Sequence, residues 1–522
     1  MTFRWTALLI GTCVATSATA AAPRHIETVG ALATRVGLIV GSALACSEVS
    51  RPRVQLIVEK FQAVIKEVSD TEADRSELTR LFDRYLADGR RATSIGLVEC
   101  RSAVRQFADL EQSVKDPPPQ ITYALPQVAF APPDDITTIA PLPMLPQQLN
   151  VPGVTRDEIK FGTVIPFSGP VKDTGRQLKL GIDVAFNSVN DRGGVNGRKL
   201  KLIAADDAYE PTRTLAAMKQ LYDNEKVFGY IGNFGAATAE VAVPFALERR
   251  VLFFAAFTGA NVLRRDPPDR YVFNYRPSFA EETSAIVQHL VKRRQLQPRQ
   301  IVVFAQNDSL GDTAAAGVAK ALRALGANGT AVTRLSYKRN TVDVDEAVNQ
   351  LRASKIPVKA VVMAATARAA AKFIEKTRDL YPGIIYSNVS FVGSTELANE
   401  LMLLGPRYTE NVIVTQVVPG VSGYSTLVLE YKKALGKYFP GETPSYTSLE
   451  GYVAANILIE GLKNAGPMID TERLVDALEK LRNFNLGLGV NLAFGDTEHQ
   501  ASHKIWGTAL DKTGNYQPLE LD

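Results

Sequence analysis

The sequence has few of the residues that build metal and redox centres, and no long run of charge of one sign. Its 522 residues include three cysteines, four histidines and two tryptophans, and 59 basic residues are balanced by 55 acidic ones. This balance excludes the basic footprint of a nucleic-acid-binding protein. Beyond the amino terminus the longest apolar run, Val36–Cys46, has eleven residues, whereas a membrane-spanning helix needs about 20.

The common enzyme motifs are also missing. We find no G-x-S-x-G, no P-loop, no G-x-G-x-x-G and no cysteine-rich metal set. His499 and His503 are four residues apart, a spacing that suits a metal, but Gly495 and Asp496 lie close by and indicate a pair on a surface loop. The sequence therefore predicts neither catalytic residues nor a metal or cofactor.

The amino terminus reads as an export signal. One basic residue, Arg4, precedes a short apolar stretch, and Ala18-Thr-Ala20 is a small-residue cleavage pattern, which predicts a signal peptide over residues 1–20. Cys13 raises the alternative of a lipoprotein, but Thr12 is a poor residue before a lipidated cysteine. We expect a periplasmic protein whose mature chain starts near Ala21.

Residues 24–115 have helical periodicity and little strand character. We expect four helices, among them one that opens with a capping box at Ser69–Glu72 and stops at Gly89. Cys46 and Cys100 remain after export, and an oxidising compartment favours a disulfide between them, with two separate buried thiols as the alternative. The residues of this helical module assign it no function, and an unknown protein partner is one role open to it.

A proline-rich segment follows the helical module. Ten prolines and no glycine fall between Pro117 and Pro152, a composition that prevents regular structure and makes the chain extended and semi-rigid. We interpret residues 116–155 as a linker, while a partner-binding PxxP role is the less favoured reading.

Strands and helices alternate from Thr155 to the end, which predicts α/β architecture with two doubly wound parallel-sheet lobes. The expected strands are 159–165, 199–205, 227–232, 251–255, 300–305, 330–337, 358–364, 389–393 and 411–418. The expected helices are 175–192, 211–225, 236–249, 280–296, 310–326, 343–355, 367–379, 424–438, 446–465 and 471–482.

The opening of this region, Ile159–Asp207, is the most informative part of the chain. A short strand leads into Ser168-Gly169-Pro170, and Gly193-Gly-Val-Asn-Gly197 precedes the second strand. The unit resembles the start of the type I periplasmic binding proteins, the branched-chain amino-acid-binding (leucine-binding) family. Further local matches follow in the family's order: Asp206-Asp207 with Pro211, Gly232–Glu240, Phe254–Asn261, Tyr271–Phe279, Gln306–Gly311 and Phe391–Glu396.

The resemblance covers about the last 365 residues and implies a two-lobed solute-binding protein of an ABC-type importer. It implies three chain crossings, near 277–281, 416–420 and 494–500, which form a three-stranded hinge. One lobe would contain residues 156–278 and 419–496, and the other 279–418 and 497–522. The ligand would be a small molecule, an amino acid or related carboxylate, bound by hinge closure and passed to a membrane permease. The alternative is a periplasmic sensor that reports its ligand to a signalling receptor.

The same resemblance implies where the ligand lies in the first lobe. Its carboxylate would meet the free N–H groups where a helix opens at Gly235, Ala236, Ala237 and Thr238. The loop with Ala256, Thr258 and Gly259 would help, and Phe167 and Ser168 lie at the end of the first strand. The alternative is a helix that is simply N-capped in this loop.

Four further positions are expected to line the cleft. Leu310 stands where the family has an aromatic residue, and Thr395 where some amino-acid binders have the acid that pairs with an ammonium group. Glu396 is adjacent to Thr395 and could substitute, or could be a solvated acid of a first helical turn. Tyr446 opens a helix, and lines the cleft or packs elsewhere.

Overall fold

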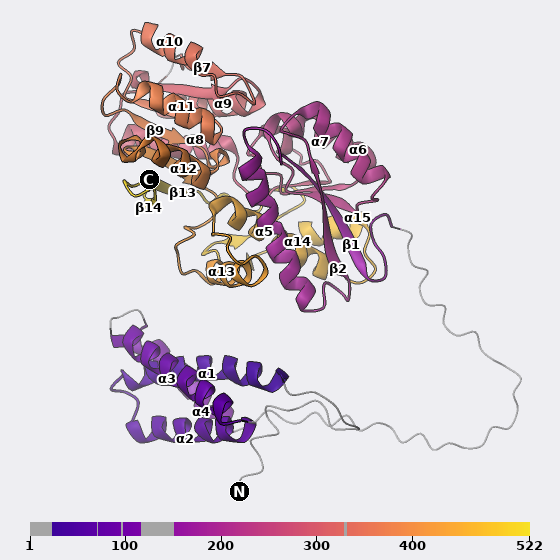
Figure 1. Cartoon of the computed structure of the whole chain (residues 1–522), viewed down its shortest axis with the longest axis vertical. Helices are drawn as coiled ribbons and strands as arrows, with labels where there is room; N and C mark the ends of the chain where they lie inside the picture. The colour runs from indigo at the N-terminus through magenta and orange to yellow at the C-terminus, as the bar shows by residue number, and fades with distance from the viewer. Residues whose placement is uncertain (1–22, 70, 95–97, 116–150, 328–330, 522) are drawn as a thin grey trace, which may run out of the picture. The chain divides into compact units, whose positions relative to one another are not determined.

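The computed structural model describes residues 23–69, 71–94, 98–115, 151–327 and 331–521. They belong to two compact units, one within residues 1–140 and the other within 141–522 (Figure 1). The predicted signal peptide and almost all of the predicted linker lie outside the described residues. In the described part of the chain, no helix is both long enough and apolar enough to cross a membrane.

The described residues of the first unit form four helices around a small apolar core. Val54, Ile57, Phe61, Phe82 and Phe107 are buried in it, as the helical periodicity predicts. The helices are α1 (Pro23–Leu44), α2 (Arg51–Val68), α3 (Glu72–Ser94) and α4 (Cys100–Lys115).

We predicted that a helix ends at Gly89, but α3 continues through Gly89 to Ser94. A Cβ at Gly89 would lie 2.3 Å from the carbonyl oxygen of Leu38, and one at Gly41 would lie 2.0 Å from that of Leu86. Both values are below any real contact, so helices α1 and α3 approach each other backbone to backbone. Gly89 is therefore a packing residue. Glycine is common both at helix ends and at close helix contacts, so the sequence alone does not distinguish the two roles.

The predicted capping box at Ser69–Glu72 is also wrong, because the helix α3 is capped two residues later. The Thr71 hydroxyl donates to the Asp74 carboxylate over 2.6 Å, and accepts from the Asp74 backbone N–H over 3.1 Å. Ser69 instead donates to the Ile65 carbonyl at the end of α2, over 2.5 Å. Ser69 therefore serves the end of α2, and Thr71 serves the start of α3.

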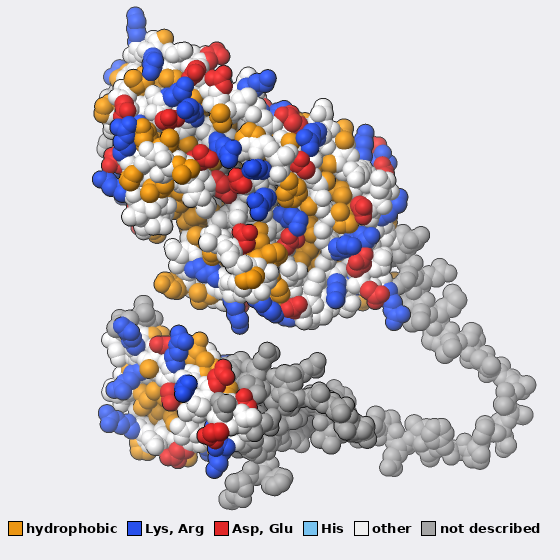
Figure 2. All heavy atoms as spheres, in the orientation of Figure 1, with side chains coloured by type: hydrophobic (Ala, Val, Ile, Leu, Met, Phe, Trp, Pro, Cys, Tyr) orange, Lys and Arg blue, Asp and Glu red, His pale blue; other side chains and the backbone are white. Residues whose placement is uncertain are grey.

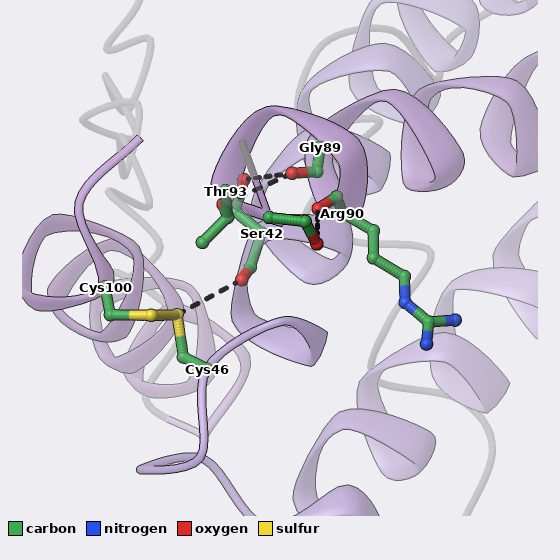
Figure 3. The surroundings of a disulfide bond; sticks show 7 residues. Ser42, Cys46, Gly89, Arg90, Thr93 and Cys100 are labelled. Carbon is green, nitrogen blue, oxygen red and sulfur yellow. Dashed lines mark hydrogen bonds between the residues drawn. A yellow bond between two sulfur atoms is a disulfide. The ribbon is translucent and has the colours of Figure 1, made fainter. Parts of the chain in front are cut away.

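Cys46 and Cys100 form the predicted disulfide, with 5.6 Å between their Cα atoms (Figure 3). Cys46 follows the end of α1 and Cys100 is the first residue of α4, so the bond ties the first helix to the last. Nearby, the Ser42 hydroxyl donates to the Gly89 carbonyl over 3.2 Å and joins α1 to α3 (Figure 3).

The second unit contains two large sheets, each with helices packed against it (Figure 1). The first lobe is built on a parallel sheet with strand order β2-β1-β3-β4-β5. Its strands are β1 (Glu158–Ile165), β2 (Lys199–Asp206), β3 (Gly229–Ile231), β4 (Leu252–Phe254) and β5 (Val272–Phe273). Its helices are α5 (Lys172–Asp191), α6 (Pro211–Asp223), α7 (Ala236–Arg249), α13 (Thr426–Tyr438), α14 (Tyr446–Ala465) and α15 (Thr471–Glu479).

The second lobe is built on a seven-stranded sheet of order β14-β13-β10-β9-β8-β6-β7, in which β13 and β14 run antiparallel at one edge. Its strands are β6 (Ile301–Gln306), β7 (Arg334–Tyr337), β8 (Ala360–Ala364), β9 (Ile385–Asn388), β10 (Val412–Gln416), β13 (Trp506–Leu510) and β14 (Tyr516–Leu519). Its helices are α8 (Phe279–Gln288), continued by a π-helical turn to Arg293, α9 (Ser309–Ala324), α10 (Asp345–Ala353), α11 (Ala367–Thr377) and α12 (Ser394–Leu404).

The chain passes between the two lobes at three places. The first connection runs from β5 to α8, the second from β10 to α13, and the third from the short hairpin β11–β12 (Phe484–Asn485 and Asn491–Leu492) to β13. The first and third connections touch, because the Ala501 N–H donates to the Asn274 carbonyl over 2.8 Å. The predicted fold class, two parallel-sheet lobes after an all-α module, is confirmed.

One predicted strand is displaced in the structure. The sequence predicts a strand over 389–393, but the strand β9 ends at Asn388, and Ser390–Val392 form a 3₁₀ turn before the unpredicted helix α12. The stretch from Ile384 to Val392 is rich in β-type residues throughout, so local preference does not fix its register. Pairing of Tyr386–Asn388 with both neighbouring strands decides it.

Candidate ligand-binding site

The loop after β1 is held by an acid from the neighbouring strand. Asp206 accepts the backbone N–H groups of Phe167 and Ser168 over 2.8 and 3.1 Å, and the Ser168 hydroxyl over 2.6 Å. Partial burial would raise the pKa of Asp206, but these hydrogen bonds outweigh it and lower the pKa to about 2. Ser168 is therefore bonded to its own loop, and Phe167 packs at the edge of the apolar core.

The helix α7 opens at Gly235, as predicted. Gly235 has φ of 101° and precedes Ala236, the first helical residue. Ala236, Ala237 and Thr238 are all buried. The Thr238 hydroxyl donates back to the carbonyls of Phe234 and Gly235. The anion donors left at this helix end are therefore the backbone N–H groups of the first turn.

The second predicted loop lies next to the first, since Phe234 and Phe257 form a parallel bridge. Ala256 and Thr258 are buried, and the Thr258 hydroxyl accepts the Ala260 N–H over 3.3 Å. A Cβ at Gly259 would lie 2.5 Å from the backbone nitrogen of Phe279. This loop is thus packed tightly against the start of the second lobe.

Aromatic rings from both lobes fill the space between these loops. Phe234 and Phe257 stack with 5.4 Å between ring centroids, and Phe391 of the second lobe lies 5.0 Å from Phe234 and 5.7 Å from Phe257. Tyr209 packs edge-on against Phe234 at 5.2 Å. Leu310 is fully buried in the same apolar cluster. The two lobes therefore meet through a shared apolar core in this form.

Polar contacts also join the lobes beside Tyr209 of this cluster. Arg339 of the second lobe pairs with Glu210 of the first over 3.0 Å. Asn340 donates to the Ala208 carbonyl over 3.0 Å and to Glu210 over 2.5 Å. These polar contacts hold the two lobes against each other.

A cavity of about 300 Å³ lies between the lobes, on the side of α5 and α12. Of the predicted residues it is lined by Thr395 and Glu396, and it also contains Asp173, Arg176 and Arg368. The Glu396 Oε2 atom is buried and has no hydrogen-bond partner. Burial, with a smaller contribution from Asp173, raises the pKa of Glu396 to about 7.

A second, much smaller cavity of about 10 Å³ lies where both lobes meet the second connection. Tyr446, a predicted residue, lines it, and burial raises the pKa of this tyrosine to about 12. The other lining residues are Phe257, Ser390, Gln416, Val417, Val418, Thr447 and Glu450.

Beside the small cavity is a buried charge cluster that the sequence analysis missed. Arg276 of the first connection is 1% exposed, and its guanidinium lies 4.7 Å from the ring centroid of Phe257. It is 3.6 Å from Glu282 of the second lobe and 3.6 Å from Glu450 of the first. Only the fold brings these three positions together, so no local pattern could reveal them.

His499 and His503 do not form the predicted surface pair. His499 is 4% exposed and stacks on Phe273 with 3.8 Å between ring centroids, because the third connection runs beside β5. His503 is more exposed and contacts Glu281 over 2.6 Å. Within the described residues no group of three histidine, cysteine or acidic side chains is arranged to hold a metal ion.

Known proteins with this architecture identify the second unit. The model of the family described as periplasmic binding protein matches residues 158–515. The chain belongs to the periplasmic binding protein family. Members of this family are substrate-binding proteins rather than enzymes, which agrees with the absence of catalytic motifs in the sequence.

Individual relatives of this periplasmic binding protein support the same family assignment. It is 27% identical over 323 residues to Leu/Ile/Val-binding protein homolog 7 of Brucella abortus, covering 58% of this chain and 77% of that one. It is 35% identical to a possible leucine/isoleucine/valine-binding protein of Rhodopirellula baltica whose structure is known, with a TM-score of 0.66 and coverage of 72% of this chain and 98% of that one.

A third comparison supports the fold alone. A branched-chain amino acid ABC transporter protein of Thermus thermophilus, solved with bound valine, is 16% identical, with a TM-score of 0.60 and coverage of 70% of this chain and 96% of that one. The family match begins at residue 158, so the helical module lies outside it.

Proposed function

We propose that this chain is an exported binding protein that carries an amino acid or related carboxylate to an ABC-type membrane permease. The observation that carries the proposal is the family match over residues 158–515, together with two sheets joined by three connections. Relatives named Leu/Ile/Val-binding proteins support an amino acid as the first ligand to test.

The ligand would bind in the cleft between the lobes, and the lobes would close on it by bending at the three connections. In the described form the aromatic cluster occupies the space in front of α7, so the lobes must separate before a ligand can enter. The positions that we propose to line the ligand are Phe167, Ser168, Gly235, Ala236, Ala237, Thr238, Ala256, Thr258, Gly259, Leu310, Thr395, Glu396 and Tyr446.

Carboxylate recognition would depend on the first turn of α7 and on Thr258. Backbone N–H groups at a helix start, together with the positive end of the helix dipole, stabilise an anion. Within the part of the chain that the structure describes, the Thr258 hydroxyl has one hydrogen bond, which it accepts from the Ala260 N–H over 3.3 Å, so its own proton remains available to a ligand.

A thermal-shift screen tests the proposal. Purified full-length protein would be heated with each of the twenty amino acids and with their 2-oxo acids. A ligand that binds only the folded form stabilises it by about 2.7 kcal/mol at a hundredfold excess over its dissociation constant. If no amino acid or carboxylate raises the melting temperature, the proposed function is wrong.

A further inference from the structure

The third connection between the lobes carries an imidazole that lies between two acids. His503 Nδ1 is 2.6 Å from the Glu281 carboxylate, and His503 Nε2 is 3.1 Å from the Glu498 carboxylate. A ring nitrogen donates to a carboxylate only when it carries a proton, and neutral imidazole has a proton on one nitrogen alone. Both contacts together therefore require an imidazolium, which donates one charge-assisted hydrogen bond to each acid.

The two acids belong to opposite sides of the hinge. Glu281 is in the first turn of α8, the helix that begins the second lobe. Glu498 immediately precedes His499, which stacks on Phe273 of strand β5 in the first lobe. His503 therefore spans the point at which the third connection leaves the first lobe for the second.

The Glu281 carboxylate is also fixed by groups other than His503. It accepts the Ser278 N–H over 2.7 Å and the Ser278 hydroxyl over 2.6 Å, within the capping box of α8, and it accepts Gln500 Nε2 over 3.1 Å. Partial burial would raise the pKa of Glu281, but hydrogen bonds from His503 and Ser278 outweigh it and lower the pKa to about 2. Glu281 is therefore ionised over the whole range in which an imidazole titrates.

His503 and both acids line a cavity of about 370 Å³ beside the first and third connections. The other charged or titratable residues that line it are Arg264, Arg265, Asp266 and His499. The two arginines have partners of their own, Gln500 for Arg264 and Asp269 for Arg265. Within the part of the chain that the structure describes, the ionic contacts of His503 are those with the two acids.

The surroundings of His503 favour its charged form. The hydrogen bond with Glu281 raises the pKa of His503 above its ordinary value of 6.5, partial burial opposes the rise, and the charge of Glu498 adds to it. A raised pKa means that the bridge is fully formed below about pH 6.5 and is lost as the pH rises through the higher value.

We propose that His503 is a proton-dependent bridge across the hinge. Its imidazolium bonds to Glu498 on the first-lobe side and to Glu281 on the second-lobe side, and so favours the arrangement in which the lobes are in contact. Loss of the proton leaves the lone pair of one ring nitrogen facing a carboxylate, which breaks the bridge and eases separation of the lobes. The inference uses the hinge bending of the proposed function, but it does not depend on the ligand.

The first test measures the pKa of His503 in the ligand-free, full-length protein by NMR titration of its ring protons. The chain has four histidines, so the signal that is missing in His503→Gln assigns the residue. We expect a pKa above 6.5 in the wild type and a lower value in both Glu281→Gln and Glu498→Gln. His289, which contacts Arg294, is the internal control and should titrate alike in all proteins. A wild-type value at or below 6.5, or no change in Glu498→Gln, would overturn the inference.

The second test follows the lobes themselves by single-molecule energy transfer. Leu403 of the second lobe is 84% exposed, and Tyr424, just before α13 of the first lobe, is 87% exposed. Dyes attached to Leu403→Cys and Tyr424→Cys therefore report the distance between the lobes. The native Cys46 and Cys100 are joined in a disulfide and do not take up dye, and Cys13 lies in the predicted signal peptide.

The quantity compared is the ratio of molecules with the lobes in contact to molecules with the lobes apart. Between pH 5.5 and pH 8.5 this ratio should fall by about 2- to 5-fold more in the wild type than in His503→Gln. This is the range of an exposed ion pair, and the His503 side chain is 55% exposed. Glu396 and Glu450, whose pKa values are raised to about 7, are present in both proteins, so the difference isolates His503.

His503→Lys is the matched control, because lysine keeps its positive charge at both pH values. Its ratio should fall no more than that of His503→Gln, and at pH 8.5 it should exceed that of His503→Gln. Equal falls in the wild type and in His503→Gln would overturn the inference. Since neither test uses a ligand, a failed thermal-shift screen would refute the proposed function and leave this result standing.

Discussion

The side chain of Gln306 donates a hydrogen bond to the Tyr209 hydroxyl over 3.0 Å, and this bond joins the second lobe to the first. Tyr209 is fully buried, and its ring packs against Gly235 at the start of α7. A single side chain thus packs at the N-cap of α7 and also bonds to the second lobe. If the lobes open as we propose, opening breaks this hydrogen bond and moves the second lobe away from Tyr209.

Tyr209→Phe should loosen the closed form without affecting packing. The variant loses one buried hydrogen bond, at a cost of about 0.5–1.5 kcal/mol, and Gln306 keeps its bond to Asp308. Backbone hydrogen exchange in the segments 207–210 and 306–308 should become faster in the ligand-free protein.

Tyr230→Phe is the matched control for Tyr209→Phe. The Tyr230 hydroxyl donates to the Met218 carbonyl within the first lobe over 2.6 Å. This variant should lose a similar amount of stability but leave exchange in the interlobe segments unchanged. Equal exchange in both variants would show that Tyr209 does not control opening.

Thr258→Ala should weaken carboxylate ligands by on the order of 1–3 kcal/mol, because a hydrogen bond to a charged group is lost. Calorimetry with the amino acid found in the screen measures the change. Thr258→Ser keeps the hydroxyl and should bind nearly as tightly as the wild type. An unchanged affinity in Thr258→Ala would remove this loop from the site.

Much of the fold follows from local sequence signals. The helices α7 and α14 have the predicted bounds because Gly235 and Ser445 stand at their N-caps. The helix α12 was missed because it begins directly after Gly393, in a loop of Gly and Ser residues that resembles a turn. Strands β13 and β14 are at a sheet edge and were also missed. The strand β13 pairs with β10, about ninety residues away in the register of Gln416 and Trp506, and β14 pairs only with β13.

The site could be predicted only in part. Motifs after strands predict which loops meet, because strand ends of a parallel sheet lie on one edge. They do not reveal that Tyr209 covers the loop at Gly235, or that Arg276 lies between Glu282 and Glu450. The first contact joins two loops of one lobe and the second joins both lobes, and the resulting burial, rather than any local pattern, raises the pKa of Glu450.

The glycines of the helical module give a direct test of its close helix packing. Gly89→Ala should destabilise the module by about 1–3 kcal/mol, since the new Cβ would meet the Leu38 carbonyl at 2.3 Å. Gly436→Ala in α13, where nothing lies within 4 Å of the new Cβ, should instead stabilise its unit by about 0.5–1 kcal/mol. Thermal unfolding measures both, and a neutral Gly89→Ala would contradict the close approach of α1 and α3.

The disulfide should account for much of the stability of the helical module. Cys46 and Cys100 are 54 residues apart in sequence, and closing a loop of that length stabilises the folded state by roughly 4 kcal/mol. The Cys46→Ser/Cys100→Ser variant should therefore unfold in this unit at lower temperature, with the second unit unaffected. Mass spectrometry of exported protein that found two free thiols would contradict the pairing.

The ligand-free protein should lose stability as the pH rises, in a way that depends on Glu450. Its folded pKa, about 7, is above its ordinary value of 4.5 because the carboxylate is buried. Its contribution to stability is therefore complete below about pH 4.5 and is lost as the pH rises through 7, since the unfolded chain gives up the proton first. Glu450→Gln is neutral at every pH and should escape this loss.

The measurement is the difference in unfolding free energy between Glu450→Gln and the wild type, from urea titrations at pH 5 and pH 8. The unfolding free energy of Glu450→Gln minus that of the wild type should be larger at pH 8 than at pH 5 by on the order of 1–3 kcal/mol. Asp207 and Glu396 also have raised pKa values, about 6 and about 7, but both are present in either protein and cancel.

Glu210→Gln should behave in the opposite sense, because hydrogen bonds from Asn340 and Arg339 outweigh partial burial and lower the pKa of Glu210. Removing that acid costs stability at neutral pH and little in acid. A pH-independent difference for Glu450→Gln would mean that Glu450 is ionised in the ligand-free protein and that its charge is already compensated.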